Sequence, residues 1–257
     1  MTAETAVDAA ALRAALSGPG HLFQDFACVP STASTNADLV AAARSGAAAG
    51  TVLVADHQSA GRGRFDRRWE APPGASVAVS VLLRPDGASI ARWMWLPLIA
   101  GVAVAEGIGA SAGLGAEVKW PNDVLVGGRK VCGILSERVD DAAVIGIGIN
   151  TALDADELPV PTATSLRLAG SDASATDVVI GVLTALEDAY RRWESTADLR
   201  EWYVRQCSTI GREVRMEQPG GGYVEGRATG VDASGCLLVW TASGERAFAA
   251  GDVLHLR

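Results

Sequence analysis

Residues 117–149 constrain the fold most, because this stretch is a run of short strand-like segments. The segments cover residues 117–120, 123–126, 130–138 and 143–149. Gly127 and Gly128 separate the second segment from the third, and paired glycines are typical of a tight hairpin turn. Such a turn would present Arg129 and Lys130 at the start of the next strand. The sequence therefore predicts successive strands with two basic side chains beside one turn.

Helices and further strands flank this run. Apolar patterns predict helices over residues 6–17, 37–45, 92–110, 176–195 and 197–208, and strands over residues 51–55 and 76–83. The longest apolar run lies within residues 92–110 and stops at Glu106, which makes it short for a membrane span. We therefore predict a buried helix there and no association with a membrane.

The pattern changes after Gly211. Short strand-like segments over residues 214–216, 222–231, 236–240, 246–249 and 253–256 are separated by turns, several of them rich in glycine. Such spacing is typical of a small all-β barrel. The expected organisation is an α+β protein of two domains, with a mixed-sheet domain over residues 1–208 and a small barrel over residues 209–257.

Charge and cysteine usage narrow the choice of partners and compartment. The net charge of −8 argues against nucleic acid as a general partner, because non-specific binding depends on neutralising phosphates. The four cysteines, Cys28, Cys132, Cys207 and Cys236, form no Cys-x-x-Cys pair and favour neither a zinc site nor a disulfide framework. No basic leader opens the chain, so we expect a cytoplasmic protein with reduced thiols.

Residues 61–69, which we call the arginine loop, hold four arginines and two glycines. Glycine lets the backbone turn tightly and approach a ligand, and guanidinium groups bind phosphate and carboxylate with a fixed, forked geometry. Trp69 closes the loop with a flat face on which a base can stack. Phosphate, carboxylate and base together suggest a nucleotide used on an acid, although the loop alone fits a solvated basic segment equally well.

Several motifs along the chain point to one family. They are Ser34-Thr35-Asn36, the arginine loop led by Gln58, Trp120-Pro121-Asn122-Asp123, an Arg-Lys-x-x-Gly-Ile-Leu strand that starts at Arg129, and a Gly-x-Gly-x-Asn strand end that finishes at Asn150. In this order and spacing they closely resemble the biotin–protein ligases over roughly residues 30–257. Any one motif is weak, but together in register they are specific.

The resemblance implies a mixed-sheet catalytic domain of the class II aminoacyl-tRNA synthetase and biotin ligase type, followed by an SH3-like β-barrel. It implies a two-step reaction in which biotin and ATP give biotinyl-5′-AMP, and a lysine of a carrier protein then takes the biotin. The expected carrier is the biotin carboxyl carrier domain of an acyl-CoA or pyruvate carboxylase. Mg²⁺ would accompany ATP, and a homodimer is a further expectation from the family.

The resemblance also implies roles for particular side chains. Lys130 would be the central catalytic cation, supported by Arg62 and Arg64. Biotin would be bound by Ser34, Thr35, Asn36, Gln58, Gly61, Arg62, Gly63, Arg64, Lys130 and Gly133. ATP and the adenylate would be bound by Arg64, Arg67, Trp69, Asn122, Lys130 and Asn150. Asp123 would either hold Mg²⁺ or only order its turn.

One residue departs from the family pattern. Asp66 stands in the arginine loop where the family usually has glycine, and aspartate adopts left-handed backbone less readily than glycine. Its negative charge also lies among arginines that would bind phosphate. Loop geometry and retention of the adenylate are therefore the expectations that this residue puts in doubt.

Three alternatives stay open beside this interpretation. A lipoate–protein ligase would activate a different acid, but would lack the C-terminal barrel and the arginine loop that ends in Trp69. A biotin-responsive repressor would need a winged helix, for which the stretch before Ser34 is too short, so DNA binding is not expected. An inactive binding module would have no need of Lys130.

Overall fold

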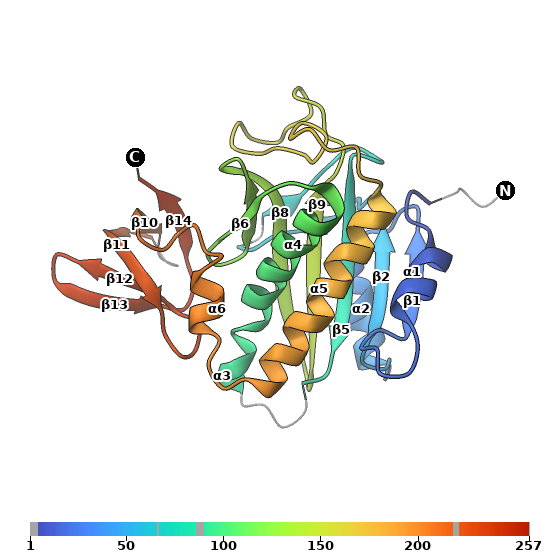
Figure 1. Cartoon of the computed structure of the whole chain (residues 1–257), viewed down its shortest axis with the longest axis horizontal. Helices are drawn as coiled ribbons and strands as arrows, with labels where there is room; N and C mark the ends of the chain where they lie inside the picture. Colours follow the sequence, from blue (N-terminus) through green and yellow to red (C-terminus); the bar gives the residue numbers. More distant parts are fainter. Residues whose placement is uncertain (1–4, 66, 86–89, 218–220, 257) are drawn as a thin grey trace.

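The computed structural model of the chain describes residues 5–65, 67–85, 90–217 and 221–256. The larger of the sheets in this part of the chain has seven strands (Figure 1). Their order is β1 (Asp25–Val29), β2 (Thr51–Ala55), β5 (Ser76–Leu83), β9 (Ala142–Asn150), β8 (Arg129–Val139), β7 (Asp123–Val126) and β6 (Ala116–Lys119). β1 and β2 are parallel and all other neighbours in this order are antiparallel, so the sheet is mixed.

The strands predicted between residues 117 and 149 are confirmed, and their bounds differ by no more than one residue at either end. Gly127 and Gly128 have φ angles of 56° and 76°, which are the positive values that this hairpin turn requires. The turn joins β7 to β8 and places Arg129 and Lys130 at the first two positions of β8. The predicted hairpin therefore forms as expected.

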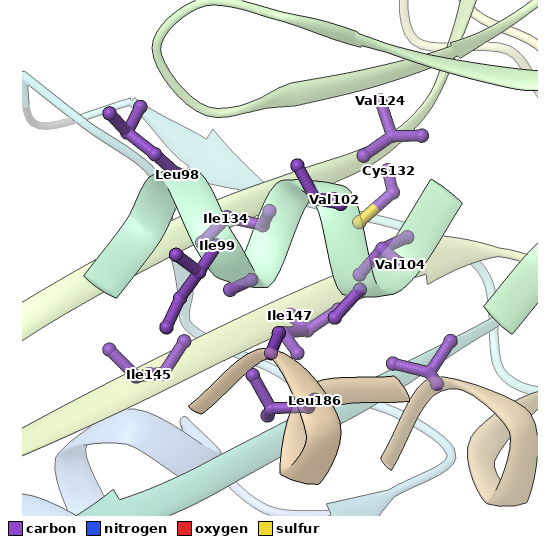
Figure 2. Packing of buried hydrophobic residues seen from close by; sticks show 14 of the residues in the cluster. Leu98, Ile99, Val102, Val104, Val124, Cys132, Ile134, Ile145, Ile147 and Leu186 are labelled. Atoms are coloured by element: carbon purple, nitrogen blue, oxygen red, sulfur yellow. The ribbon is translucent and has the colours of Figure 1, made fainter. Parts of the chain in front are cut away.

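Two long helices cover one face of the sheet, and a large hydrophobic cluster lies beneath them (Figures 1 and 2). α4 (Leu96–Ala112) and α5 (Ala175–Ser195) lie side by side, and at Gly107 a Cβ would be only 2.6 Å from the Val182 backbone. Together with α3 (Ile90–Trp93), α4 is long and apolar enough to cross a membrane by length and composition, but 67% of the apolar window is buried inside the protein. The buried helix predicted from the sequence is confirmed.

The opposite face carries α2 (Thr35–Arg44). The side chain of Ser34 caps this helix by accepting a hydrogen bond from the Ala37 N–H, as its position before the helix predicts. A second, smaller apolar cluster with Leu39, Leu82 and Val144 fixes α2 to the sheet. Strand alternation puts successive residues of β5 and β9 on opposite faces, so even-numbered positions point to the α2 side. α1 (Ala9–Leu16) packs instead against α5 and β1.

Residues 213–255, which follow α5 and the next short helix in the chain, form a second, five-stranded antiparallel sheet. Its order is β13 (Gly244–Phe248), β12 (Leu237–Thr241), β11 (Tyr223–Val231), β10 (Glu213–Glu217) and β14 (Asp252–His255). The indole N–H groups of Trp95, just before α4, and Trp120, just after β6, donate to the Ala233 and Gly235 carbonyls, so they hold the loop between β11 and β12. The short strands predicted after Gly211 are confirmed, and the protein is α+β.

Some local predictions differ from the structure. β1 was not predicted, and the helix expected over residues 197–208 shortens to α6 (Arg200–Val204). The arginine loop contains a small hairpin of β3 (Gly61–Arg62) and β4 (Arg68–Trp69), which the sequence did not indicate. The question raised by Asp66 lies outside the described residues.

Candidate functional site

A cavity of about 140 Å³ opens on the α2 side of the sheet, under the arginine loop. β8 and β9 contribute its floor, while the start of α2 and the arginine loop contribute its walls. It brings together most of the residues predicted from the sequence: Ser34, Thr35, Asn36, Gln58, Arg62, Gly63, Arg64, Arg67, Trp69, Asn122, Asp123, Lys130 and Gly133. Residues from Ser34 to Asp252, far apart in the chain, therefore line one space.

The floor of the cavity is made of glycines that accept the Trp69 indole. Gly133 and Gly148 are paired across β8 and β9. A Cβ on Gly148 would lie 2.5 Å from the Trp69 ring, and one on Gly133 would lie 3.0 Å from it. The indole therefore packs against bare backbone, and alanine has no room at Gly148. The Trp69 Nε1 atom is buried and finds no acceptor among the described residues.

The start of α2 forms the neutral, polar end of the cavity. Gln58 Oε1 accepts a hydrogen bond from the Thr35 backbone N–H at 2.8 Å and lies 3.1 Å from the Thr35 hydroxyl. Ser80 on β5 lies 2.7 Å from the Thr35 hydroxyl and 2.7 Å from Asn36 Oδ1. Thr35, Asn36 and Ser80 are buried, so this end is rigid and uncharged.

Lys130 is held at the centre of the cavity by an aspartate. Its Nζ lies 2.5 Å from Asp123 Oδ1, with the Lys130 side chain 33% exposed. The backbone of Lys130 is pinned as well, because its N–H donates to Thr162 and its carbonyl accepts from Thr164. A Cβ on Gly133 would come within 3.2 Å of Nζ, so the ammonium lies directly against the floor.

The arginines of the loop are each held by a different partner. Arg62 donates to Glu137 at 2.9 Å, and Arg64 donates to Asn122 Oδ1 at 2.9 Å and to the Gly251 carbonyl. Arg67 forms an ion pair with Asp252 of β14. Burial lowers the pKa of the Arg64 guanidinium, an effect that the nearby carboxylates of Asp252 and Asp123 oppose. The small sheet therefore reaches the cavity through residues 251 and 252.

Two predicted site residues do not line this cavity. Gly61 pairs with Trp69 in the loop hairpin, where a Cβ would lie 2.4 Å from the Trp69 carbonyl oxygen. Asn150 is buried at the end of β9, and its side-chain N–H₂ donates to the Thr164 carbonyl. Gly61 therefore permits the loop to close, and Asn150 anchors the segment after β9.

The residues present make a poor cage for a metal ion. Among the described residues, no group of three or more histidines, cysteines, aspartates or glutamates could hold one. The Asp123 carboxylate already contacts Lys130 and lies 3.8 Å from Lys119 Nζ, so its charge is neutralised by two ammonium groups. A dedicated protein site for Mg²⁺ does not fit this arrangement.

Several residues that shape the site were assigned no role from the sequence. Gly146 and Gly148 belong to a recognised motif and share a face with Gly133, so strand alternation could have placed them. Glu137 and Ser80 give no local signal, because their partners lie on other elements. Asp252 is separated from Arg67 by most of the chain, and only the fold brings the two together.

Comparison with known proteins identifies the family of the chain. The model of the biotin/lipoate A/B protein ligase family matches residues 27–151, and that of the biotin protein ligase C-terminal domain matches residues 209–256. The biotin–[acetyl-CoA-carboxylase] ligase of Mycobacterium tuberculosis is 39% identical, over 98% of this chain and 96% of that protein. The corresponding ligase of Paracoccus denitrificans is 33% identical, over 86% of this chain and 97% of its own length.

A solved structure shows the same architecture. The biotin protein ligase from Aquifex aeolicus in complex with biotin and ATP has a TM-score of 0.78 and 27% identity, covering 91% of this chain and 100% of that chain. The motifs, the cavity that gathers them, the C-terminal sheet and these relatives all agree. The chain belongs to the biotin protein ligase family.

Proposed function

We propose that this protein uses ATP to convert biotin to biotinyl-5′-AMP and then transfers the biotin to a lysine of a biotin carboxyl carrier domain. In this proposal residues 1–208 form the catalytic domain, residues 209–257 form a small accessory domain, and the enzyme works in the cytoplasm. The carrier would belong to a carboxylase, because the relative from M. tuberculosis bears the name of an acetyl-CoA-carboxylase ligase. A homodimer stays a prediction.

One observation carries the proposal: a neutral polar end and a cationic end meet in a single cavity. Ser34, Thr35, Asn36 and Gln58 offer uncharged hydrogen-bonding groups that suit a ureido ring. Lys130, Arg64 and Arg67 offer positive charge in the same cavity, where the Lys130 ammonium lies against Gly133 of the floor. A molecule with a cyclic urea at one end and a carboxylate at the other matches this distribution of groups.

In the first step a carboxylate oxygen of biotin attacks the α-phosphorus of ATP, and the bond to pyrophosphate breaks. Both reactants are anions, so the step needs neutralised charge and fixed geometry rather than a protein nucleophile. We assign the central charge to Lys130, because Asp123 holds its ammonium at one point. Arg62 and Arg64 close over the reacting groups, and Asn122 keeps Arg64 in place.

In the second step the amine of the carrier lysine attacks the carbonyl carbon of the adenylate. The bond to the phosphate oxygen breaks, AMP leaves, and the amine nitrogen loses a proton as the amide forms. Lys130 again faces the oxygens that gain charge. No side chain of the enzyme becomes covalently attached in either step.

The nucleotide would occupy the part of the cavity that the arginine loop and Asn122 line together. Arg67 would bind the pyrophosphate portion, and Trp69 would present its free face to adenine while its other side packs on Gly133 and Gly148. Asn150 is left out of the direct contacts because it does not line the cavity and its side-chain N–H₂ donates to the Thr164 carbonyl. Mg²⁺ would arrive with ATP and be coordinated mainly by phosphate and water, so no step is assigned to a protein-bound metal.

Biotin-dependent exchange between ATP and labelled pyrophosphate tests the proposal, because it reports the first step without a carrier. We expect exchange with biotin and none above background with lipoate. Exchange with lipoate and none with biotin would replace this function by lipoate activation. Absence of exchange with either acid would refute the proposed adenylation.

A further inference from the structure

The hydrogen bonds at the start of α2 form a nearly closed circuit. It runs from Gln58 to Thr35, then through Ser80 to Asn36, then to Glu137 and finally to Arg62. Arg62 lies four positions after Gln58, so both ends of the circuit belong to the same short stretch of the chain. The circuit joins the neutral end of the cavity to the arginine loop.

The directions of these hydrogen bonds can be worked out from the donors. The Asn36 side-chain N–H₂ donates to Glu137 Oε2 at 2.8 Å and to the Leu135 carbonyl at 3.2 Å. Asn36 Oδ1 must therefore accept from Ser80, which uses the single proton of that hydroxyl. The Thr35 hydroxyl then has to donate its single proton to Ser80 Oγ, and the Thr35 backbone N–H makes the hydrogen bond to Gln58 Oε1. Turning the Asn36 amide over would bring its oxygen against the Glu137 carboxylate and its N–H₂ against Gly146.

Glu137 is the only carboxylate in the circuit, and it contacts both neighbours through the same oxygen. Its Oε2 accepts from Asn36 at 2.8 Å and from Arg62 at 2.9 Å. The side chain is 25% exposed and lies behind the arginine loop, outside the cavity itself. Glu137 therefore does not line the cavity, yet it accepts hydrogen bonds from Asn36 at the neutral end and from Arg62 of the arginine loop.

We infer that Glu137 is a positioning residue that links the biotin end of the site to the arginine loop. It fixes the amide orientation of Asn36, so that Oδ1 faces the ureido N–H, and it holds Arg62 over the cavity. A ligand that orders Asn36 thereby favours the position of Arg62 that ATP needs, and the reverse also holds. The inference rests on the proposed function, since it names a residue that couples the two proposed substrates.

The test measures binding of each ligand alone and in the presence of the other. Isothermal titration gives Kd for biotin and for a non-hydrolysable ATP analogue, and the ratio of Kd values with and without the second ligand gives the coupling. For Glu137→Gln we expect biotin to bind about tenfold more weakly, because a charge-assisted hydrogen bond is lost. We also expect the coupling ratio to fall towards one.

Two further variants separate this role from general stability. Glu225→Gln removes a comparable ion pair with Arg215 on the second sheet, at 2.7 Å, and should leave both Kd values unchanged. Arg62→Gln combined with Glu137→Gln should lower the coupling no more than either change alone, because both act through one contact. A thermal melt of each variant checks that the fold is retained.

The outcomes are distinguishable. Wild-type biotin affinity and wild-type coupling in Glu137→Gln would overturn the inference, as would fully additive losses of coupling in the double variant. If the wild-type protein does not bind biotin at all, the proposed function itself fails. Weak binding in Glu137→Gln beside normal binding in Glu225→Gln supports the link through Glu137.

Discussion

Replacing Lys130 by alanine should remove most of the adenylation activity while leaving the fold intact. The ammonium lies 2.5 Å from Asp123 and directly against the glycine floor, where the carboxylate and the α-phosphate are proposed to meet. The Lys130 side chain is only one-third exposed, so the charge acts in a partly water-excluded space. No other lysine lines this cavity among the described residues.

The expected size of the effect follows from electrostatics. Two unit charges about 4 Å apart interact by about 4 kcal/mol at the effective dielectric constant of a protein site. Part of this is offset by Asp123, which leaves roughly 3 kcal/mol, or about a hundredfold in rate. The free energy of unfolding should change by less than about 1 kcal/mol, because partly exposed ion pairs contribute little and Lys119 stays near Asp123.

Pyrophosphate exchange at saturating biotin and ATP measures the loss, and urea unfolding checks the stability. Lys130→Arg should restore little, because the wider, planar guanidinium cannot place a point charge where the ammonium contacts Asp123 and Gly133. Arg129→Ala is the matched control, since it removes the neighbouring exposed cation of the same strand. Near-normal exchange in Lys130→Ala would refute the reasoning and move the central role to Arg62 or Arg64.

Further predictions concern the floor, the second sheet and the loop. Gly148→Ala should weaken adenylate binding by roughly tenfold or more, because its Cβ would displace the Trp69 ring; unchanged affinity in a titration would contradict the packing. Burial, with Lys119 and Arg212 nearby, lowers the pKa of His255 to about 4. As the pH drops from about 6.5 to 4, His255 is protonated in the unfolded state before it is protonated in the folded state, so the free energy of unfolding should fall. His255→Gln should make the free energy of unfolding, measured by urea titration, depend less on pH in this range. Trypsin should cut residues 62–68 more slowly when biotinyl-5′-AMP is bound, since the ligand pairs with the arginines; equal cleavage rates would argue against ordering of the loop.

Much of the fold could be predicted because its strands carry strong local signals. β5 and β9 alternate or run apolar over many residues, and Gly127-Gly128 marks a turn that few other sequences allow. β1 gives no comparable signal, since five residues with a charged first position resemble a loop. It becomes a strand because β2 offers a parallel edge, which is a property of the assembled sheet.

The site was predictable where a motif supplies both the side chain and its element. Lys130 follows the hairpin glycines, and Gly133 lies three positions later on the same strand, so both line one cavity in the structure. Glu137 and Asp252 could not be predicted, because their roles exist only through partners on distant elements. The charged side chains can be identified from the sequence, but their hydrogen-bond and ion-pair partners are known only from the folded structure.

Because of its packing, Trp69 can report ligand binding through its fluorescence. Its indole lies on the glycine floor with a buried N–H and a lysine ammonium 5.9 Å from the ring centre. A ligand that stacks on this ring or displaces Lys130 must alter its fluorescence, whatever the chemistry that follows. The chain has seven tryptophans, so the difference between the wild-type protein and Trp69→Phe isolates that emission. Filling of the cavity can then be followed in real time without a label.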